Sequence, residues 1–236
     1  MTYSLVPIGI VHSPFREKFG IPRQPLLVPE AKATLELLAP YDCVEALAGL
    51  EGFSHIWLTF IFHQAMRDQW QPQVRPPRLG GNRRVGVFAS RSPFRPNPIG
   101  LSVVALDGIS NQQGKVELLL SGVDILDGTP VLDIKPYLPY ADSIPDAKSG
   151  YAPEPPQASK YVCFSDKAEA QLQQRDGGGE LKRFITNLLA SDPRPAYKNR
   201  SQPDRIYGMR LYDFDLKWLV LDDKVEVVEL GSVEAI

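Results

Sequence analysis

The sequence contains few cysteine and histidine residues. Its 236 residues include two cysteines, Cys43 and Cys163, and three histidines, His12, His55 and His63. Two isolated cysteines cannot form a disulfide framework, and the histidines lack the spacing of zinc ligands. These shortages exclude disulfide-rich and zinc-binding classes, and we expect no bound metal.

Long hydrophobic runs and common nucleotide-binding motifs are also missing. The first residues, "MTYSLVPIGIVHSPF", lack the basic start and apolar core of a signal peptide, and no apolar run approaches membrane-spanning length. No segment matches a dinucleotide fingerprint, a Walker A loop or a nucleophile elbow. We expect a cytoplasmic protein without a membrane partner, and any cofactor must be held by a different loop architecture.

Acidic residues are absent from one long interval, between Asp68 and Asp107, although the whole chain has a net charge of −2. All the basic residues inside it are arginines: Arg75, Arg78, Arg83, Arg84, Arg91 and Arg95. The guanidinium group matches phosphate and carboxylate geometry and stacks on bases. The interval indicates an anion-binding region, with a solvated basic face balanced by acids elsewhere as the alternative.

Hydrophobic periodicity predicts short strands in the first two-thirds of the chain. Val-, Ile-, Leu- and aromatic-rich segments are mostly separated by turn-forming residues, at 5–13, 33–39, 53–63, 85–90, 100–109, 115–123 and 129–134. Seven short strands with little helical spacing favour a barrel or a sandwich, in a domain of residues 1–150. The fold class is therefore mainly β.

The last third of the chain has a different pattern. The proline-rich stretch 151–159 marks a boundary, and helical spacing follows at 165–176 and 180–191, with Ser165 as the predicted N-cap. Residues 206–230 indicate two strands that turn near Asp222 and Asp223. We expect a smaller α+β C-terminal domain of residues 151–236.

Four polar or proline-stiffened loops lie at predicted strand ends. They are "FREKFGIPRQP" at 15–25, "FHQAM" at 62–66, "SRSPFRPNPIG" at 90–100 and "DILDGTPVLDIKPYLPYAD" at 124–142. In this order, and with "DPRPAY" at 192–197, they resemble the tRNA methyltransferase O family, also called TsaA-like or YaeB-like. The resemblance implies an antiparallel β-barrel that binds S-adenosylmethionine. It also implies a homodimer that methylates N6 of threonylcarbamoyladenosine at position 37, next to the anticodon of tRNA.

The resemblance also implies which residues surround the cofactor. These are Pro22, Arg23, Gln24, His63, Gln64, Arg91, Leu101, Asp127, Gly128, Thr129 and Pro130. Adenosylmethionine needs an apolar wall for adenine, partners for the ribose and a cation for its carboxylate, and these loops offer such groups. Proline stiffening would help to hold donor and acceptor in line.

The tRNA anticodon stem-loop is the expected partner, and its contacts are assigned to basic and polar residues. The candidates are Arg83, Arg84, Arg95, Asn97, Lys135, Arg194 and Tyr197. The acceptor nitrogen is urea-like and must lose its proton, so a base is expected among Asp133, Asp127 and His63. The sequence does not choose between them, and the catalytic residue stays unassigned.

Simpler interpretations accompany these assignments. A histidine at the end of an apolar strand is ordinarily structural, and Asn97 with Pro98 or Asp127 with Gly128 is ordinarily a turn. Two other functions stay open at this point. A non-catalytic RNA-binding module would explain the arginine interval without a cofactor, and a small-molecule methyltransferase would need the cofactor without the basic interval.

Overall fold

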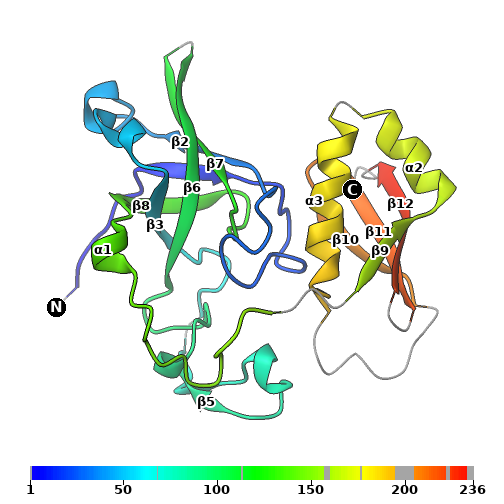
Figure 1. The fold of residues 1–236 in the computed structure, drawn as a ribbon. Helices are drawn as coiled ribbons and strands as arrows, with labels where there is room; N and C mark the ends of the chain where they lie inside the picture. The colour runs from blue at the N-terminus through cyan, green and yellow to red at the C-terminus, as the bar shows by residue number, and fades with distance from the viewer. Residues whose placement is uncertain are drawn as a thin grey trace.

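The computed structural model describes residues 2–67, 69–112, 114–156, 160–175, 177–194, 205–221 and 224–232. Figure 1 shows a β-barrel built from the first half of the chain, beside a smaller sheet that carries two helices. The loop that follows the first strand reaches from the barrel toward the smaller unit.

The barrel closes through six strands in the order β1-β2-β7-β6-β3-β8, and each neighbouring pair is antiparallel. The strands are β1 (Gly9–His12), β2 (Ala33–Leu37), β3 (His55–Ile61), β6 (Ile99–Gln112), β7 (Lys115–Ser121) and β8 (Thr129–Pro136). The predicted antiparallel β-barrel is confirmed.

Side-chain alternation along β3 explains how the barrel fills its interior. Ile56, Leu58 and Phe60 are buried, and the residues between them point to the other face of the strand. This alternation follows from the two-residue period of a strand, and a closed barrel leaves no strand edge exposed. The interior is therefore a packed apolar core, with one end open to the loops described below.

The predicted strand at 85–90 is wrong as a barrel strand. Val85 and Gly86 form β5 (Val85–Gly86), which pairs with β4 (Gln73–Val74) in a two-stranded sheet separate from the barrel. The chain then enters the 3₁₀ turn η4 (Val87–Ala89), in which Val87 is buried while Phe88 is exposed. The segment has the apolar composition of a strand, but the 3₁₀ turn changes the direction of the chain after Gly86. The other short helical turns are η1 (Val44–Leu47), η2 (Leu50–Gly52), η3 (Pro77–Leu79) and α1 (Pro139–Asp142).

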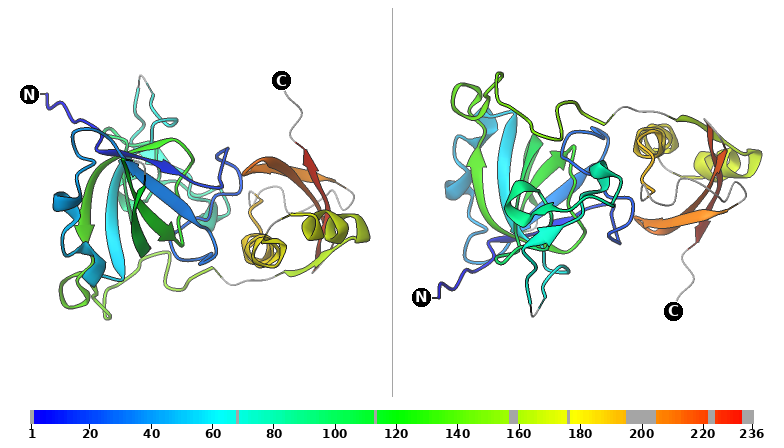
Figure 2. Two further views of the ribbon diagram at one scale, coloured as in Figure 1. Left: turned by 90° about the horizontal axis from the view of Figure 1, so that it is seen from above. Right: turned by 90° about the horizontal axis from the view of Figure 1, so that it is seen from below.

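The smaller unit is a four-stranded sheet in the order β10-β11-β12-β9, with β9 parallel to β12. The strands are β9 (Tyr161–Phe164), β10 (Tyr207–Leu211), β11 (Phe214–Leu221) and β12 (Lys224–Ser232). The helices α2 (Asp166–Gln173) and α3 (Gly178–Ala190) pack against β12 and β9, and Figure 2 shows them from two further directions.

The helices agree with the sequence predictions, whereas the strands of this unit differ. The Ser165 hydroxyl accepts a hydrogen bond from the amide of Ala168, as expected of an N-cap. Residues 206–230 form three strands instead of two, because the chain turns at Tyr212 and Asp213 without glycine or proline. Tyr212 has a φ of 48°, a conformation that is uncommon for a bulky residue and that the sequence does not predict. Strand β9 was not predicted, and the expected turn at Asp222 and Asp223 lies outside the described residues.

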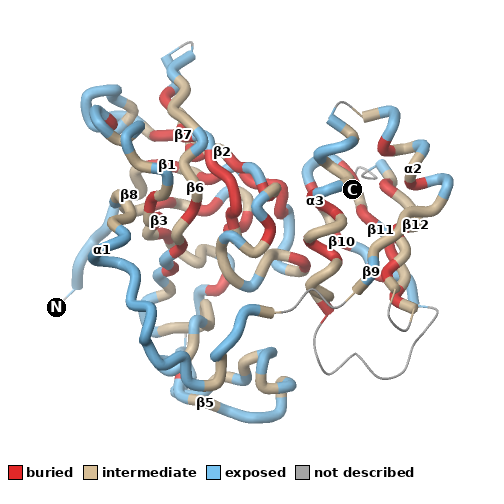
Figure 3. Tube along the Cα trace, in the orientation of Figure 1, coloured by how far each residue is buried: buried red, intermediate tan, exposed pale blue. Residues whose placement is uncertain are grey.

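The loop after β1 packs on the smaller unit. Phe15 forms an isolated bridge to Leu211, and its ring centroid lies 6.1 Å from that of Phe184. The ring of Phe19 stacks on Trp218 at 5.9 Å. Buried apolar residues of both units consequently form one continuous cluster. In Figure 3 the red segments mark the buried residues of each unit. Among the described residues, no helix is both long and apolar enough to cross a membrane.

Candidate functional site

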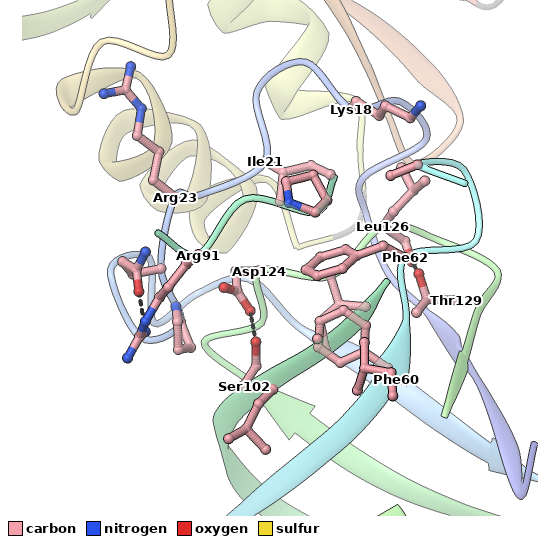
Figure 4. Close-up of a pocket in the computed structure, with 18 of the residues that line it drawn as sticks. Lys18, Ile21, Arg23, Phe60, Phe62, Arg91, Ser102, Asp124, Leu126 and Thr129 are labelled. Carbon is pink, nitrogen blue, oxygen red and sulfur yellow. Dashed lines mark hydrogen bonds between the residues drawn. The ribbon is translucent and has the colours of Figure 1, made fainter. Parts of the chain in front are cut away.

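A cavity of about 500 Å³ opens at one end of the barrel. Its lining comes from four loops, at 18–25, 62–65, 90–95 and 124–126, together with the adjoining ends of strands. Figure 4 shows Asp124, Phe60 and Phe62 close together in this lining, whereas the side chains of Lys18 and Arg23 extend away from them. A volume of this size is typical of a site for a cofactor or another small molecule.

Strand register explains why these loops meet. Ile61 at the end of β3 pairs with Ile99 at the start of β6, and Val11 near the end of β1 pairs with Thr129 at the start of β8. The segment after β7 runs back along β6, where Asp124 reaches Ser102. Loops that are distant in the sequence therefore lie at the same end of the barrel.

One wall of the cavity is apolar and largely aromatic. Phe60 and Phe62 form this wall, and Trp57, Ile99 and Leu101 are further apolar residues of the lining, with Trp57 on the opposite face of β3 from Phe60. The rings of Phe60 and Phe62 meet edge to face, with centroids 5.1 Å apart. Such a wall can hold a flat ring or an aliphatic chain through apolar contact.

Cationic side chains line another part of the cavity, and main-chain or amide oxygens hold several of them. The Arg91 guanidinium donates to the side-chain oxygen of Gln24, and Lys18 Nζ donates to the Gln64 carbonyl at 2.5 Å. Arg23 donates to a carbonyl of the smaller unit, that of Arg194, at 3.3 Å. Arg91 can pair with a carboxylate or phosphate in the cavity, whereas the Arg23 side chain extends toward the smaller unit (Figure 4).

The proline-rich loop at 90–98 is braced by its own arginine. Arg95 donates to the carbonyls of Ser90 and Val87, at 2.8 and 3.3 Å, and its guanidinium lies 5.8 Å from the ring centroid of Phe88. From outside the loop, Arg67 lies 3.7 Å from the ring centroid of Phe94. Arg95 therefore has a structural role in addition to its position in the cavity lining.

Asp124 is a site residue that the sequence analysis missed. Ser102, which is buried, donates a hydrogen bond of 2.7 Å from its hydroxyl to Asp124 Oδ1 (Figure 4). Burial raises the pKa of the Asp124 carboxyl to about 6, although Ser102 and the charge of Arg91 oppose the shift. Asp124 lies between Val123 and Ile125, so its local sequence looks like the end of a buried strand, and only its contact with Ser102 identifies it.

His63 lies in the cavity lining with a lowered pKa. Burial is the main cause, and the nearby charge of Lys18 adds to it. A distance of 3.5 Å separates His63 Nδ1 from the hydroxyl of Thr129, which itself donates to the Leu126 carbonyl at 2.6 Å. The imidazole is therefore neutral near pH 7 and is able to accept a proton.

The structure brings most of the predicted cofactor residues into the cavity lining. Those present there are Pro22, Arg23, Gln24, His63, Gln64, Arg91, Leu101 and Thr129. Asp127, Gly128 and Pro130 are outside the lining, immediately beside Leu126 and Thr129. The Asp127 carboxylate accepts from the Ser13 amide at 3.0 Å and pairs with Arg16, so both of its oxygens have partners.

The remaining predicted residues occupy other places. Asp133 borders a different hollow, toward the other end of the barrel, and forms an ion pair of 2.7 Å with Lys135. Arg83, Arg84 and Asn97 are exposed on loops outside the cavity lining. Tyr197 lies outside the described residues.

Arg194 is tightly engaged within the smaller unit. Its side chain donates twice to the carboxylate of Asp192, at 2.8 and 2.7 Å, and its guanidinium lies 5.5 Å from the ring centroid of Tyr207. Only 9% of the side chain is exposed. A contact between this guanidinium and RNA would first require the ion pair to open. Across the described residues, no three His, Cys, Asp or Glu side chains are grouped so that they could hold a metal ion.

Two family models match the sequence. The tRNA-methyltransferase O N-terminal domain matches residues 10–143, and the TrmO C-terminal domain matches residues 157–233. Together the two matches span most of the chain.

Full-length relatives and solved structures are similar to this chain. An Escherichia coli protein named "tRNA (adenine(37)-N6)-methyltransferase" is 48% identical over 97% of this chain and 98% of its own length. A Pseudomonas aeruginosa protein named "Putative S-adenosylmethionine-dependent methyltransferase RcsF" is 54% identical over 92% of this chain and 93% of its own. A crystal structure of TrmO from Pseudomonas aeruginosa superposes with a TM-score of 0.81 at 46% identity, covering 98% of this chain and 99% of that one.

Proposed function

This chain belongs to the tRNA-methyltransferase O family and is an S-adenosylmethionine-dependent tRNA methyltransferase, and we propose that its barrel cavity binds the cofactor. The name of the Escherichia coli relative gives N6 of adenine 37 in tRNA as the methylated position, and we propose that the acceptor in this chain's substrate is that N6 in threonylcarbamoyladenosine, as the family resemblance implies. The observation that carries the proposal is the convergence of the four loops on one cavity with an aromatic wall and several cations.

The residues of the cavity fit the chemical parts of the cofactor. The wall that contains Phe60 and Phe62 suits the adenine ring, and Arg91 suits the carboxylate. When bound, S-adenosylmethionine supplies the methyl group on its sulfonium. Gln24 keeps the Arg91 guanidinium in place, which lowers the entropy that Arg91 loses on binding.

We assign removal of the acceptor proton to His63. The acceptor nitrogen would bond to the methyl group as the bond between that methyl and the sulfonium sulfur breaks, and it would lose its proton to an unprotonated base close by. Of the three predicted bases, His63 alone is in the cavity lining, and its lowered pKa keeps the imidazole neutral at pH 7. Asp127 already accepts from Ser13 and Arg16, and Asp133 pairs with Lys135 away from the cavity.

The tRNA is held by both parts of the chain in this proposal. Residues 1–150 bind the cofactor, and residues 151–236 help to position the anticodon stem-loop. Arg83, Arg84 and Asn97 are exposed and free of acidic neighbours in the sequence, which supports a role in contacting RNA. Arg95 in the cavity lining is a candidate partner for the threonine carboxylate of the substrate, and Tyr197 is a candidate for stacking on a base.

A homodimer with its cofactor sites near the interface is part of the proposal. Apolar side chains are exposed on the loops and strand around the cavity, at Met66, Trp70, Phe88, Ile99 and Leu101. Trp70 and Phe88 also stack, with centroids 6.4 Å apart. Exposed apolar patches commonly mark an interface. A tRNA substrate also supports a location in the cytoplasm.

Mass spectrometry of tRNA nucleosides from cells with and without the gene tests the function directly. Loss of methylated threonylcarbamoyladenosine in the deletion strain is the expected result. Purified protein should bind S-adenosylmethionine and tRNA separately and should methylate only tRNA that already carries threonylcarbamoyladenosine. Binding of tRNA without any methylation would favour a non-catalytic module, and methylation of the free nucleoside at an equal rate would favour a small-molecule enzyme.

A further inference from the structure

Asp124 is the single acidic residue of the cavity lining, as far as the structure describes the chain. The other charged or titratable groups that line the cavity are Lys18, Arg23, His63, Arg91 and Arg95. Asp124 therefore faces a cavity whose other charged lining groups are cationic, and these groups come from the loops after β1, after β3 and before β6.

The Asp124 carboxyl has one side-chain hydrogen bond and no ion pair within the described residues. Ser102 donates to Oδ1 at 2.7 Å, and both residues belong to adjoining segments at the barrel mouth. In Figure 4 the carboxyl lies between Arg91 on one side and the rings of Phe60 and Phe62 on the other. The group is thus directed into the cavity and not into a neighbouring salt bridge.

This arrangement is costly for the fold. A carboxylate in an apolar and partly buried place lacks the water that would stabilise its charge, and one hydroxyl replaces only part of that hydration. The raised pKa of Asp124 reflects the same cost. A residue that destabilises its own surroundings beside a binding cavity is a candidate for function.

The neighbouring charges of Arg91 and Asp124 match one part of the cofactor. The amino-acid end of S-adenosylmethionine carries a carboxylate and an α-ammonium on the same carbon atom. A guanidinium and a neighbouring carboxylate in the same lining can bind both groups at once, one charge for each. The adenine end carries no charge of this kind and needs the apolar wall.

We infer that Asp124 binds the α-ammonium of S-adenosylmethionine while Arg91 binds its carboxylate. The inference rests on the proposed function, in which this cavity is the cofactor site. Ser102 is a positioning residue in this arrangement, because its hydrogen bond keeps Oδ1 in place and leaves Oδ2 for the ammonium.

Three ligands and two variants test the inference by calorimetry. S-adenosylmethionine has both the sulfonium and the ammonium, S-adenosylhomocysteine has the ammonium alone, and methylthioadenosine has neither. Asp124→Asn preserves the shape of the side chain and its acceptor for Ser102 but removes the charge. The matched control is Asp107→Asn, because Asp107 accepts from the Ser121 hydroxyl at 2.9 Å and lies outside the cavity lining.

Asp124→Asn should weaken S-adenosylmethionine and S-adenosylhomocysteine at least tenfold and leave methylthioadenosine within twofold, as expected of one charge-assisted contact. Asp107→Asn should change none of them. A loss confined to S-adenosylmethionine would overturn the inference in favour of a sulfonium contact. Equal losses for all three ligands, or no loss, would also overturn it. If the wild-type protein bound none of them, the proposed cofactor site itself would be wrong.

If Asp124→Asn fails to fold, the number of protons that the wild-type protein releases on ligand binding tests the inference instead. At pH 6, S-adenosylhomocysteine binding should release protons, because the ammonium favours the ionised form of Asp124. Titrations in two buffers with different ionisation enthalpies measure this release. Methylthioadenosine should release markedly fewer protons, and His63→Gln should leave the difference between the two ligands unchanged. Equal proton release for both ligands would overturn the inference.

Discussion

The guanidinium of Arg23, in the lining of the barrel cavity, donates a hydrogen bond of 3.3 Å to the main-chain carbonyl of Arg194 in the smaller unit. Part of the cavity wall is therefore supported by residues more than 170 positions away in the sequence. Phe19 and Gly20 strengthen this connection, since Phe19 stacks on Trp218 and a Cβ at Gly20 would meet the sulfur of Met209 at 2.5 Å.

A protein truncated after Gly150 should lose cofactor affinity as well as tRNA affinity. The truncation removes the partners of Phe15 and Phe19, so the loop at 14–25 would expose apolar surface and lose its fixed position. Calorimetry with S-adenosylmethionine measures the first effect and a filter-binding assay measures the second. A truncated barrel with full cofactor affinity would show that the loop is ordered without the smaller unit.

Replacing Arg91 with alanine should weaken S-adenosylmethionine binding by about 1.5–3 kcal/mol, as expected for loss of a hydrogen bond to a charged group. The barrel should remain folded, because Arg91 is exposed and its partner Gln24 can turn to water. Arg183→Ala is the control, since that arginine is exposed on α3 and outside the cavity lining. Unchanged affinity in a folded Arg91→Ala protein would remove Arg91 from the cofactor site.

Gly100→Ala should destabilise the barrel and narrow the cavity. A Cβ at Gly100 would lie 2.4 Å from the ring of Phe60, so the ring must move from its present position. Overpacking of this kind costs about 1–3 kcal/mol. Gly86→Ala is a matched control, because Gly86 has φ −57° and no atoms within 4 Å of the added group. Thermal unfolding with and without cofactor separates the two effects, and equal melting temperatures for the two variants would contradict the packing described for Phe60.

In the unliganded protein, the contribution of Asp124 to the free energy of unfolding should decrease as the pH rises from about 4 to about 6. The folded protein keeps the Asp124 proton up to a pKa of about 6, whereas the unfolded chain loses it near the ordinary value for aspartate. The unfolding free energy contributed by this group therefore falls as pH rises through that window, by on the order of 3 kcal/mol in total.

Urea unfolding of the wild type and of Asp124→Asn, compared from pH 4 to pH 7, measures this contribution. The comparison cancels the opposite effect of His63, whose lowered pKa makes the protein less stable as pH falls. Asp124→Asn should gain stability relative to the wild type as pH rises. A constant difference between the two proteins would mean that Asp124 titrates normally.

Neutralising Arg83 and Arg84 together should weaken tRNA binding and flatten its dependence on salt, while cofactor binding persists. Fewer counterions are released when fewer phosphates are paired, so the slope of log affinity against log salt should fall by about 0.7–0.9 for each lost phosphate contact. Lys32 and Lys115, which pair with Asp107 and Glu36 on the barrel and lie outside the cavity lining, provide a double control. A wild-type salt slope in the double arginine variant would contradict a role in phosphate binding.

The sequence predicted the barrel well because its strands obey a local rule. The alternation in β3 and the apolar runs of β6 and β7 are visible without any knowledge of partners. The segment at 85–90 has the same composition, but a 3₁₀ turn around Val87 decides its path. The turn at Tyr212 was missed for the related reason that packing, and not glycine or proline, permits its positive φ.

The candidate site was predictable to the extent that its residues lie in loops with distinctive sequences. Arg91 and Gln24 were expected near each other only through the family resemblance, and in the structure their side chains are hydrogen-bonded. Asp124 carries no local signal, because its importance depends on Ser102, 22 positions away, and on the surrounding cations. Long-range contacts of this kind cannot be read from periodicity or composition.

The loop between β1 and β2 has a consequence for recombining relatives of this enzyme. The covalent boundary near residue 150 suggests two exchangeable modules, but the physical boundary runs elsewhere, because Phe15 and Phe19 pack among residues of the C-terminal sheet and α3. A chimera that joins this barrel to a relative's C-terminal part must therefore carry that relative's version of residues 14–23 as well. The segments that must be exchanged together are the C-terminal sheet and the loop after β1, which lies near the N-terminal end of the sequence.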